Sequence, residues 1–484
     1  MGKEKKEGGN EKHKSEGIIT KKAENLSDWY SEVVQKGGMA DYSPIRGFMI
    51  IRPHAYSIWQ GIQDYFNKVL KDKGVKNAYF PLLIPDSFFK REAQHAEGFA
   101  PELAYVQGSE DGEKLALRPT SETIMYDAYS KWVRSWRDLP LKINQWANVI
   151  RWEVKQTKPF IRTREFLWQE GHCVFSDEEG AIENMEDIIG EYQRLLEEVL
   201  AIPIIRGKKS EMEKFPGART TMTIEAIMPD GKALQCGTSH NLADNFAKAF
   251  NVMFKDKDEK EHYAYQTSWG FSTRLIGALI MVHGDDKGLI LPPRIAENKA
   301  VIVPILFEDS KTKVLKKCAE IAKKLEGIGA LLDEREGYSP GWKFNEWELK
   351  GIPLRIEIGP KDMDKKQVTV VRRDNGKKEQ ISEGKVVERV KEILEEMQGE
   401  MYKKAEKFLH SRIDEAKTFK ELEKKLKEGK VVKVYMANNK EVEAELKDKT
   451  GGATSRIIEV VSKEGKCIIS GENVKTVGYV AKSY

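Results

Sequence analysis

The sequence predicts a multidomain α/β protein, and three features of the chain lead to this prediction. Its 484 residues exceed one average domain, so roughly two to four domains are expected. Apolar residues make up 40% of the chain, which is enough for real cores, and no apolar run approaches the ~20 residues that span a bilayer. Between residues 296 and 398 strand-like and helix-like stretches alternate, as in a compact α/β domain with a mixed sheet.

The first two segments are a tail and a large domain. Residues 1–25 are hydrophilic and lack the apolar core of a signal peptide, so we predict a disordered, solvated tail. Residues 26–295 are rich in Trp, Phe and short apolar runs, with strands and helices mixed. An amphipathic helix is predicted over 54–73, where apolar residues recur at helical spacing at Ile58, Ile62, Phe66 and Val69. Leu291-Pro292-Pro293-Arg294 ends this domain, since two prolines stop regular pairing.

The third segment, 296–398, is the predicted α/β domain. Its expected elements are a strand at 301–307, a helix at 311–327, a strand ending at 331–334, a short helix at 343–350, strands at 353–358 and 368–372, and a closing helix at 385–398.

The fourth segment, 399–484, is dense in Lys and Glu. Thr418 and Glu421 have the pattern of a capping box and Gly429 suits a C-cap, so a helix is predicted over 418–428. The remaining residues, 430–484, are expected to form a small, β-rich module.

Charge and cysteine content exclude several classes of protein. The 81 basic and 77 acidic residues leave a net charge of only +4, so any binding of nucleic acid must come from local clusters. The four cysteines are far apart with no CxxC spacing, which argues against a disulfide scaffold and an obvious zinc knuckle. We therefore expect a cytoplasmic protein that makes no membrane contact.

Two segments carry residues suited to binding phosphate. In 151–172, two strand-like stretches flank a polar loop with four basic residues, Lys155, Lys158, Arg162 and Arg164. Guanidinium forks match phosphate oxygens and stay charged, although a solvated hairpin with surface arginines is the alternative. In 269–286, Ser272 and Arg274 begin an apolar helix, where free backbone N–H groups and the dipole favour an anion. The co-occurrence of the two segments favours the phosphate interpretation.

These segments resemble the motifs of class II aminoacyl-tRNA synthetases. Arg151-x-Glu153, the loop with Arg162, and Phe166 look like motif 2, and Gly270 to Arg274 looks like motif 3. Asn77-Ala78-Tyr79-Phe80-Pro81 resembles motif 1, whose proline lies at the dimer interface in that class. The segments RPTSE, FLWQEGH, GTSH, SWG and VHGDDKGL are similar to those of prolyl-tRNA synthetases of the archaeal and eukaryotic type, and the resemblance runs from about Trp29 to Tyr484.

The resemblance implies a fold and an activity. The fold would be an antiparallel sheet core with helices, an α/β anticodon-binding domain and a small C-terminal α+β module. The activity would be ATP-dependent activation of L-proline as prolyl-adenylate and transfer to tRNA(Pro), by a homodimer that uses ATP and Mg²⁺. Because the attacking carboxylate is already ionised at neutral pH, catalysis would consist of positioning and charge stabilisation.

The resemblance also implies roles for individual residues. The catalytic residues would be Arg151 and Arg274. ATP would be bound by Arg151, Glu153, Arg162, Thr163, Phe166, Gln235, Thr238, Ser272 and Arg274, with Glu225 as a ligand of Mg²⁺. Proline would be bound by Phe99, Glu102, Thr120, Glu122, Arg151, Trp168, His172 and His240. The anticodon would be read by Glu348, Arg355 and Lys361. The alternatives are structural roles for the two histidines and ordinary surface charges for the three anticodon residues.

The chain departs from its relatives in the C-terminal module. Many relatives carry four cysteines there as a zinc site, but 434–443 has none and 466–472 keeps only Cys467. We therefore predict no zinc and a module stabilised by apolar burial, from Val432, Val434, Ile457, Ile458, Val460, Ile468 and Ile469. Tyr484 matches the family's ending, in which the terminal carboxylate packs toward the active site.

Two rival functions stay open on sequence grounds. The first is a noncatalytic synthetase-like protein that binds tRNA or regulates, although such proteins usually lose the ATP arginines or the amino-acid pocket. The second is a class II synthetase for threonine, glycine or histidine, against which the TSE loop and the GTSH segment speak.

Overall fold

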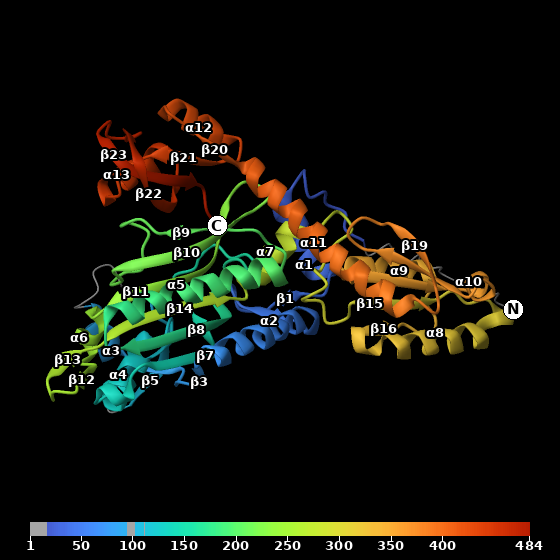
Figure 1. Ribbon diagram of the computed structural model, residues 1–484, viewed down its shortest axis with the longest axis horizontal. Helices are drawn as coiled ribbons and strands as arrows, with labels where there is room; N and C mark the ends of the chain where they lie inside the picture. The colour runs from blue at the N-terminus through green and yellow to red at the C-terminus, as the bar shows by residue number, and fades with distance from the viewer. Residues whose placement is uncertain (1–16, 94–101, 111) are drawn as a thin grey trace, which may run out of the picture.

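The computed structural model describes residues 17–93, 102–110 and 112–484. A large sheet with helices against it forms the main body, a smaller α/β domain lies at one end, and a C-terminal module lies above the sheet (Figure 1). The long helix α11 (Val386–Arg412) runs from the α/β domain to the C-terminal module (Figure 1). No helix in the described ranges is long and apolar enough to cross a membrane.

The main body is built on an eleven-stranded sheet of order β20-β21-β23-β22-β9-β10-β11-β14-β8-β7-β3. Neighbouring strands are antiparallel except at its two ends, β20–β21 and β3–β7, so the antiparallel core expected from the resemblance is confirmed. The strands of the main body are β3 (Lys76–Asn77), β7 (Leu141–Ile150), β8 (Glu165–Phe175), β9 (Ile205–Lys208), β10 (Thr220–Ile227), β11 (Ala233–Ala243) and β14 (Tyr265–Ser272).

Amphipathic and apolar helices bury the faces of this sheet. Helix α2 (Pro53–Asp72) confirms the predicted helix, with Ile58, Ile62 and Phe66 buried in the main core. Helix α5 (Glu178–Arg194) contacts β10, β11 and β14 and begins at Asp177, whose side chain accepts from the Gly180 N–H. Helix α7 (Arg274–His283) is buried along most of its length because nearly all of its residues are apolar.

Shorter elements complete the main body. They are α1 (Leu26–Lys36), β1 (Ala40–Tyr42), β2 (Met49–Ile51), β4 (Leu83–Pro85), α3 (Asp86–Ala93), β5 (Tyr105–Glu110), β6 (Glu113–Leu117), α4 (Glu122–Trp132), α6 (Asn245–Phe250), β12 (Met253–Lys255) and β13 (Glu261–Tyr263). The strands β4, β6 and β5 form a separate three-stranded sheet.

The predicted disordered tail is too long at its C-terminal end. The backbone N–H groups of Ile19 and Thr20 donate to the Glu32 carboxylate at 2.9 Å, and the Lys22 ammonium donates to Gly284 O at 2.6 Å. These bonds hold the stretch before Leu26 against α1 and the end of α7, although its composition is hydrophilic. Residues 1–16 of the predicted tail lie outside the described residues.

The α/β domain has the predicted mixed sheet, of order β16-β15-β17-β18-β19. Its first three strands are parallel and its last two pairings are antiparallel. Its elements are β15 (Ala300–Pro304), α8 (Lys311–Leu325), β16 (Ala330–Leu332), α9 (Pro340–Leu349), β17 (Leu354–Ile358), α10 (Pro360–Asp364), β18 (Gln367–Arg372) and β19 (Lys378–Ser382). The sequence does not predict β19, because its five residues include only one apolar residue, Ile381.

Helix α11 corrects the predicted end of this domain. The closing helix was expected to stop at 398, but it continues to Arg412 without a break. The helix continues through Gly399 because the residues after it keep a buried stripe, with Met401, Ala405 and Leu409 inward.

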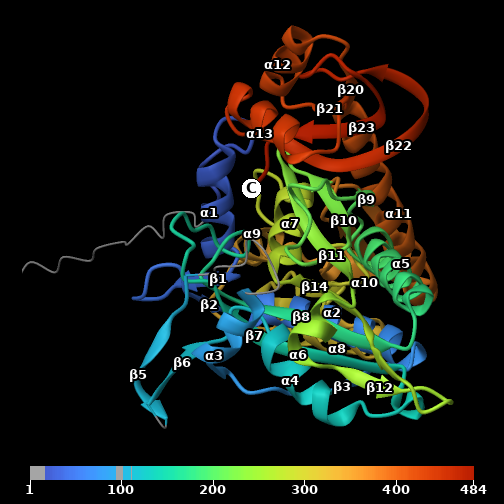
Figure 2. The same ribbon diagram turned by 90° about the vertical axis from the view of Figure 1, so that its left-hand side faces the viewer.

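The C-terminal module is α+β and extends the main sheet. Its elements are β20 (Ile413–Glu415), α12 (Phe419–Lys427), β21 (Val431–Tyr435), α13 (Lys440–Lys449), β22 (Thr454–Lys466) and β23 (Asn473–Ala481). The predicted capping of α12 is confirmed, because the Thr418 hydroxyl accepts from the Glu421 N–H at 3.3 Å. Strand β22 pairs with β9, and Figure 2 shows β22 and β23 above β9 and β10.

The apolar residues predicted to stabilise this module behave as expected with one exception. Most are buried or partly buried in it, but Val460 is 84% exposed, so its predicted burial is wrong.

The last residues return to the main body. The Ala233 N–H donates to Lys482 O at 2.8 Å, and the Tyr484 N–H donates to Ala233 O at 3.2 Å.

Candidate active site

A cavity of about 360 Å³ opens where β8, β11 and β14 lie side by side. Its lining includes many of the residues expected to bind ATP and proline: Thr120, Glu122, Arg151, Glu153, Trp168, His172, Gln235, Thr238 and His240. The structure therefore brings together residues from 120 to 240 that the sequence leaves far apart. The chain also places two buried donors here without a protein partner in its described part, Trp168 Nε1 and the Ser268 hydroxyl. Such donors suit a polar ligand.

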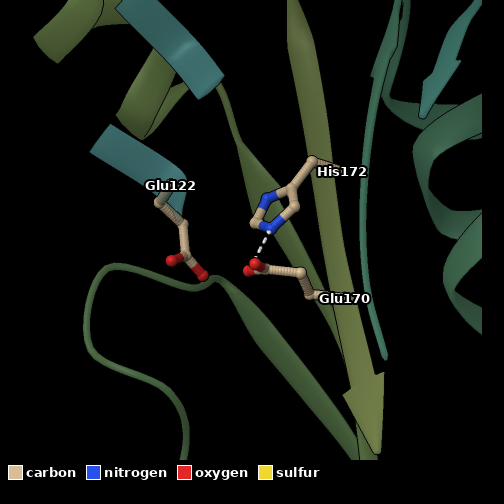
Figure 3. A group of neighbouring side chains, drawn as sticks. All are labelled: Glu122, Glu170 and His172. Carbon is tan, nitrogen blue, oxygen red and sulfur yellow. Dashed lines mark hydrogen bonds and ion pairs between the residues drawn. The ribbon is translucent and has the colours of Figure 1, made fainter. Parts of the chain in front are cut away.

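One end of the cavity is a buried acidic cluster. Figure 3 shows the carboxyl groups of Glu122 and Glu170 facing one another beside His172. One ligand atom from each of the three residues lies within 4.8 Å of the others, and all three residues are buried. The Thr120 hydroxyl donates to Glu122, while Ser121 Oγ at 2.5 Å and Gln145 Nε2 at 2.9 Å donate to Glu170. The cluster suits a cation, and the ammonium group of an amino acid is one.

A hydrogen-bond chain fixes His172 within this cluster. His172 Nε2 donates to Glu170 Oε2 at 3.1 Å, and the Tyr126 hydroxyl lies 3.0 Å from Nδ1. Burial disfavours the charged imidazole, but the bond to Glu170 and the charges of Glu122 and Glu170 outweigh it, so the pKa of His172 is raised. His172 can therefore hold this buried hydrogen-bond network together and also line the pocket.

His240 is held in the opposite electrostatic condition. Its Nδ1 lies 2.9 Å from Thr221 Oγ1, and its ring packs on Phe215 with centroids 4.7 Å apart. Burial, together with the charge of the nearby His172, lowers the pKa of His240 to about 3. His240 is therefore neutral near pH 7. Together with the Phe215 ring it forms a mainly apolar wall of the cavity.

Of the three arginines expected to bind ATP, Arg151 lines the cavity, whereas Arg274 and Arg162 lie outside its lining. Arg151 lies beside the Phe166 and Trp168 rings, at 5.5 and 5.9 Å from their centroids. Arg274 is anchored by Ile161 O at 3.0 Å and Gln235 O at 3.1 Å, and its backbone N–H donates to Ser272 Oγ. Burial lowers the pKa of Arg274, and the charge of Arg151 contributes.

Two residues of the predicted motif 2 loop lie just beyond these arginines. Arg162 is exposed on the loop, and its charge also acts on Arg274. Thr163 is buried, and its hydroxyl donates to Glu165 O at 2.7 Å. The arrangement offers several fixed positive charges to a polyphosphate.

Glu225 does not lie where the magnesium prediction needs it. It is buried behind the cavity, where its carboxylate accepts from Lys209 Nζ at 2.6 Å and from Arg456 at 3.3 Å. Burial raises the pKa of a carboxyl, but the two cations outweigh it and hold the pKa of Glu225 below its usual value. A carboxylate that already pairs with two cations does not fit a metal ligand.

The structure does not place two of the expected proline-binding residues at the pocket, for different reasons. Phe99 lies outside the described residues, and Glu102 is exposed and outside the cavity lining.

The three expected anticodon residues are only partly brought together. Arg355 donates to Glu348 at 3.1 Å and also pairs with Glu357 at 2.9 Å. Lys361 lies apart from this pair in α10 and is exposed. Glu348 also lies 3.4 Å from Lys287 of the main body.

Several lining residues had no place in the sequence-based site. Glu170 lies within the quoted FLWQEGH segment, so that segment could have suggested it. Lys209, Lys214 and Phe215 lie in a stretch without a motif, and their proximity to β11 depends on the fold.

Three family models match consecutive parts of the chain. Residues 105–283 match the tRNA synthetase class II core domain (G, H, P, S and T), and 299–393 match an anticodon binding domain. Residues 419–484 match the C-terminal domain of prolyl-tRNA synthetase. The antiparallel sheet, its pocket and these matches define a class II aminoacyl-tRNA synthetase.

Curated relatives cover nearly the whole chain. A Proline--tRNA ligase of Natranaerobius thermophilus is 47% identical over 94% of this chain and 95% of its own length. The cytoplasmic Proline--tRNA ligase of Arabidopsis thaliana is 45% identical over 97% of this chain and 91% of its own. That of Halobacterium salinarum is 45% identical over 97% and 98%. The chain belongs to the proline--tRNA ligase family.

Proposed function

We propose that this chain activates L-proline with ATP and transfers the prolyl group to tRNA(Pro). The observation that carries the proposal is one cavity lined by a buried acidic cluster and by Arg151, with Arg274 anchored to the lining residue Gln235. An amino acid carries an ammonium and a carboxylate, and ATP carries phosphates, so the acidic cluster and the arginines match the charges of the two reactants.

The chemistry follows from positioning and charge. Glu122, with Thr120, receives the secondary ammonium of proline, while Trp168 and His240 form walls for its ring. The proline carboxylate attacks the α-phosphorus of ATP, a P–O bond forms, and the bond to pyrophosphate breaks. Arg151 meets the charge that builds up on the α-phosphate, and Arg162 and Arg274 hold the outer phosphates. A ribose hydroxyl of the tRNA then attacks the carbonyl carbon and releases AMP.

Further residues bind the nucleoside of ATP. Glu153 and the backbone at Thr163 receive the adenine amine, and Phe166 stacks on the ring. Gln235, Thr238 and Ser272 lie beside the ribose and phosphates. ATP enters as its magnesium complex, so the cation is part of the substrate.

The test is proline-dependent exchange of pyrophosphate into ATP, measured with all twenty amino acids. Arg151→Ala and Arg274→Ala should each lower the rate about 10²–10³-fold, because each removes a charge that stabilises the transition state. Arg137→Ala, an exposed arginine in the same domain, is the control and should exchange normally. Normal exchange in both active-site variants would refute these roles. If none of the twenty amino acids supports exchange, the result would instead favour a noncatalytic tRNA-binding protein.

We also propose a homodimer, formed around the segment that resembles motif 1. Tyr79 in this segment is 70% exposed, and the nearby three-stranded sheet exposes Leu83 and Tyr105. Exposed apolar side chains grouped in this way are typical of an interface. Sedimentation at micromolar protein should give twice the 55.3 kDa mass of one chain. Tyr79→Glu should shift it toward monomer and Val460→Glu, at an exposed residue of the C-terminal module, should not; a wild type that sediments only as monomer would contradict the proposal.

We also propose roles for the anticodon-binding domain and the C-terminal module, and a cellular compartment. Glu348, Arg355 and Lys361 contact the anticodon of tRNA(Pro), in a domain that matches an anticodon-binding model. The chain acts in the cytoplasm, in keeping with four free, buried thiols. The C-terminal module holds no zinc.

A further inference from the structure

We propose that the C-terminal module positions one wall of the active-site pocket, and that Arg456 and Asn438 are its positioning residues. The wall is the segment 209–216, five of whose residues line the cavity: Lys209, Glu213, Lys214, Phe215 and Pro216. No motif of the sequence covers this segment.

The wall reaches the pocket through hydrogen bonds to β10. The Lys209 N–H donates to Thr221 O at 2.9 Å, and the Phe215 N–H donates to Thr221 Oγ1 at 3.0 Å. The same hydroxyl lies 2.9 Å from His240 Nδ1, and the Phe215 ring covers the His240 ring. A shift of the wall therefore moves Phe215 and His240 together.

Arg456 of β22 holds this wall from behind. Its guanidinium donates to Glu225 at 3.3 Å and to Glu213 at 3.2 Å, so it joins strand β10 to the wall. Glu225 in turn accepts from Lys209 Nζ at 2.6 Å. The side chains of Arg456 and Glu225 are 7% and 1% exposed, which excludes most solvent from this network. Truncating Arg456 would leave a buried carboxylate short of one of its two cations.

Asn438 makes a second, independent contact. Its Oδ1 accepts from the Glu211 N–H at 2.9 Å, at the middle of the wall. Asn438 follows β21 and is exposed, whereas Arg456 is buried on β22, so the two contacts come from different parts of the module. The module thus grips the wall at two points.

The strand that carries Arg456 is itself fixed inside the module. The Ser455 N–H and hydroxyl donate to the buried Glu443 at 2.9 and 2.6 Å, and Arg456 also donates to Thr454 Oγ1 at 3.0 Å. This arrangement gives the module a role at the active site that needs no metal.

The expected effect is on proline rather than ATP, because Phe215 and His240 lie on the proline side of the cavity. This step rests on the proposed function; the positioning of the wall does not. Asn438→Ala should raise the proline KM in pyrophosphate exchange about threefold, and Arg456→Met about tenfold, as a lost hydrogen bond to a neutral or charged group predicts. The kcat and the KM for ATP should change less than about twofold.

The control is Lys463→Met, an exposed charge on the same strand β22 that touches none of these groups, and it should behave as wild type. Limited trypsin digestion gives a readout that needs no substrate. Cleavage after Lys214 should be faster in Asn438→Ala and Arg456→Met than in wild type or Lys463→Met. If Arg456→Met does not fold, Asn438→Ala decides the question by both measurements.

The proposal is overturned if the cleavage rate after Lys214 is unchanged in the variants that fold. It is also overturned if the KM for ATP rises as much as the KM for proline. A faster cleavage with unchanged proline KM would retain the wall and refute its effect on proline. A wild-type chain that shows no proline-dependent exchange would refute the proposed function alone, because the cleavage test of the wall needs no substrate.

Discussion

At the scale of single residues, the pocket depends on groups whose charge the fold sets. His172 and His240 line the same cavity, yet the pKa of one is raised and that of the other is lowered. The identity of these side chains could be predicted from the sequence, because they lie in the FLWQEGH and GTSH segments. Their protonation could not, because it depends on Glu122, Glu170 and burial.

Glu225 illustrates the same limit. The family resemblance implies that Glu225 is a ligand of Mg²⁺. Its partner Arg456 lies 231 positions away in the sequence, so no local pattern predicts the ion pair. The wrong placement followed from a contact that only the folded chain makes.

A partly buried histidine outside the pocket gives a prediction on stability. His283 Nε2 lies 2.9 Å from Leu200 O, and burial lowers the pKa of His283 to about 4. Below its ordinary value of 6.5 the unfolded chain takes up a proton that the folded chain does not. The free energy of unfolding should therefore fall as pH drops from about 6.5 to about 4, by ~2–3 kcal/mol from this group. Urea unfolding across this range should show a smaller loss in His283→Gln than in wild type.

The control for this measurement is His410→Gln, since His410 is exposed on α11. It should keep the pH dependence of the wild type. An identical dependence in His283→Gln and wild type would show that His283 is not held neutral by burial.

At the scale of elements, the helices and the α/β sheet were the most predictable features. Helices α2 and α12 follow from apolar period and capping, which are local properties. Helix α11 is longer than the predicted 385–398, and β19 is not predicted from the sequence because it is short and mostly polar. In both cases packing against neighbouring elements outweighs local preference.

The pairing of β8 with β14 gives a second prediction. Gly171 lies opposite Trp269, and a Cβ added at Gly171 would lie only 2.1–2.2 Å from three carbons of the indole ring. Gly171→Ala should destabilise the protein by ~1–3 kcal/mol, because the ring cannot move without disturbing the cavity that it lines. In Gly171→Ala the midpoint of urea unfolding should fall and the proline KM should rise.

The matched control is the same substitution in α11. A Cβ at Gly399 meets nothing within 4 Å, so Gly399→Ala should stabilise by ~0.5–1 kcal/mol through helix propensity. Equal effects of the two substitutions would show that the contact with Trp269 has no energetic weight.

At the scale of the whole molecule, the boundaries were harder to predict than the domains. Each of the three matched regions was expected, but their joining was not. Strand β22 pairs with β9 across about 250 residues of chain, and a pairing of that separation leaves no signal in a local pattern.

The absence of zinc is a prediction about the whole protein. Cys467 Sγ accepts from the Ala437 N–H at 3.4 Å, and one thiolate cannot close a tetrahedral site. Elemental analysis of chelator-washed protein should find well under one zinc per chain. Stability after chelation should equal that before it; a stoichiometric zinc that survives washing would contradict the prediction.

The return of the last residues to Ala233 has a consequence for synthesis. Ala233 is made about 250 residues before Ser483, its partner in the folded protein. At roughly 5–20 residues per second, the ribosome needs about 10–50 s to produce that partner. During that interval β9 and β10 have emerged while the strands that cover their side of the sheet do not yet exist. The nascent chain therefore exposes this side of β9 and β10 for a period, whereas the finished protein covers it.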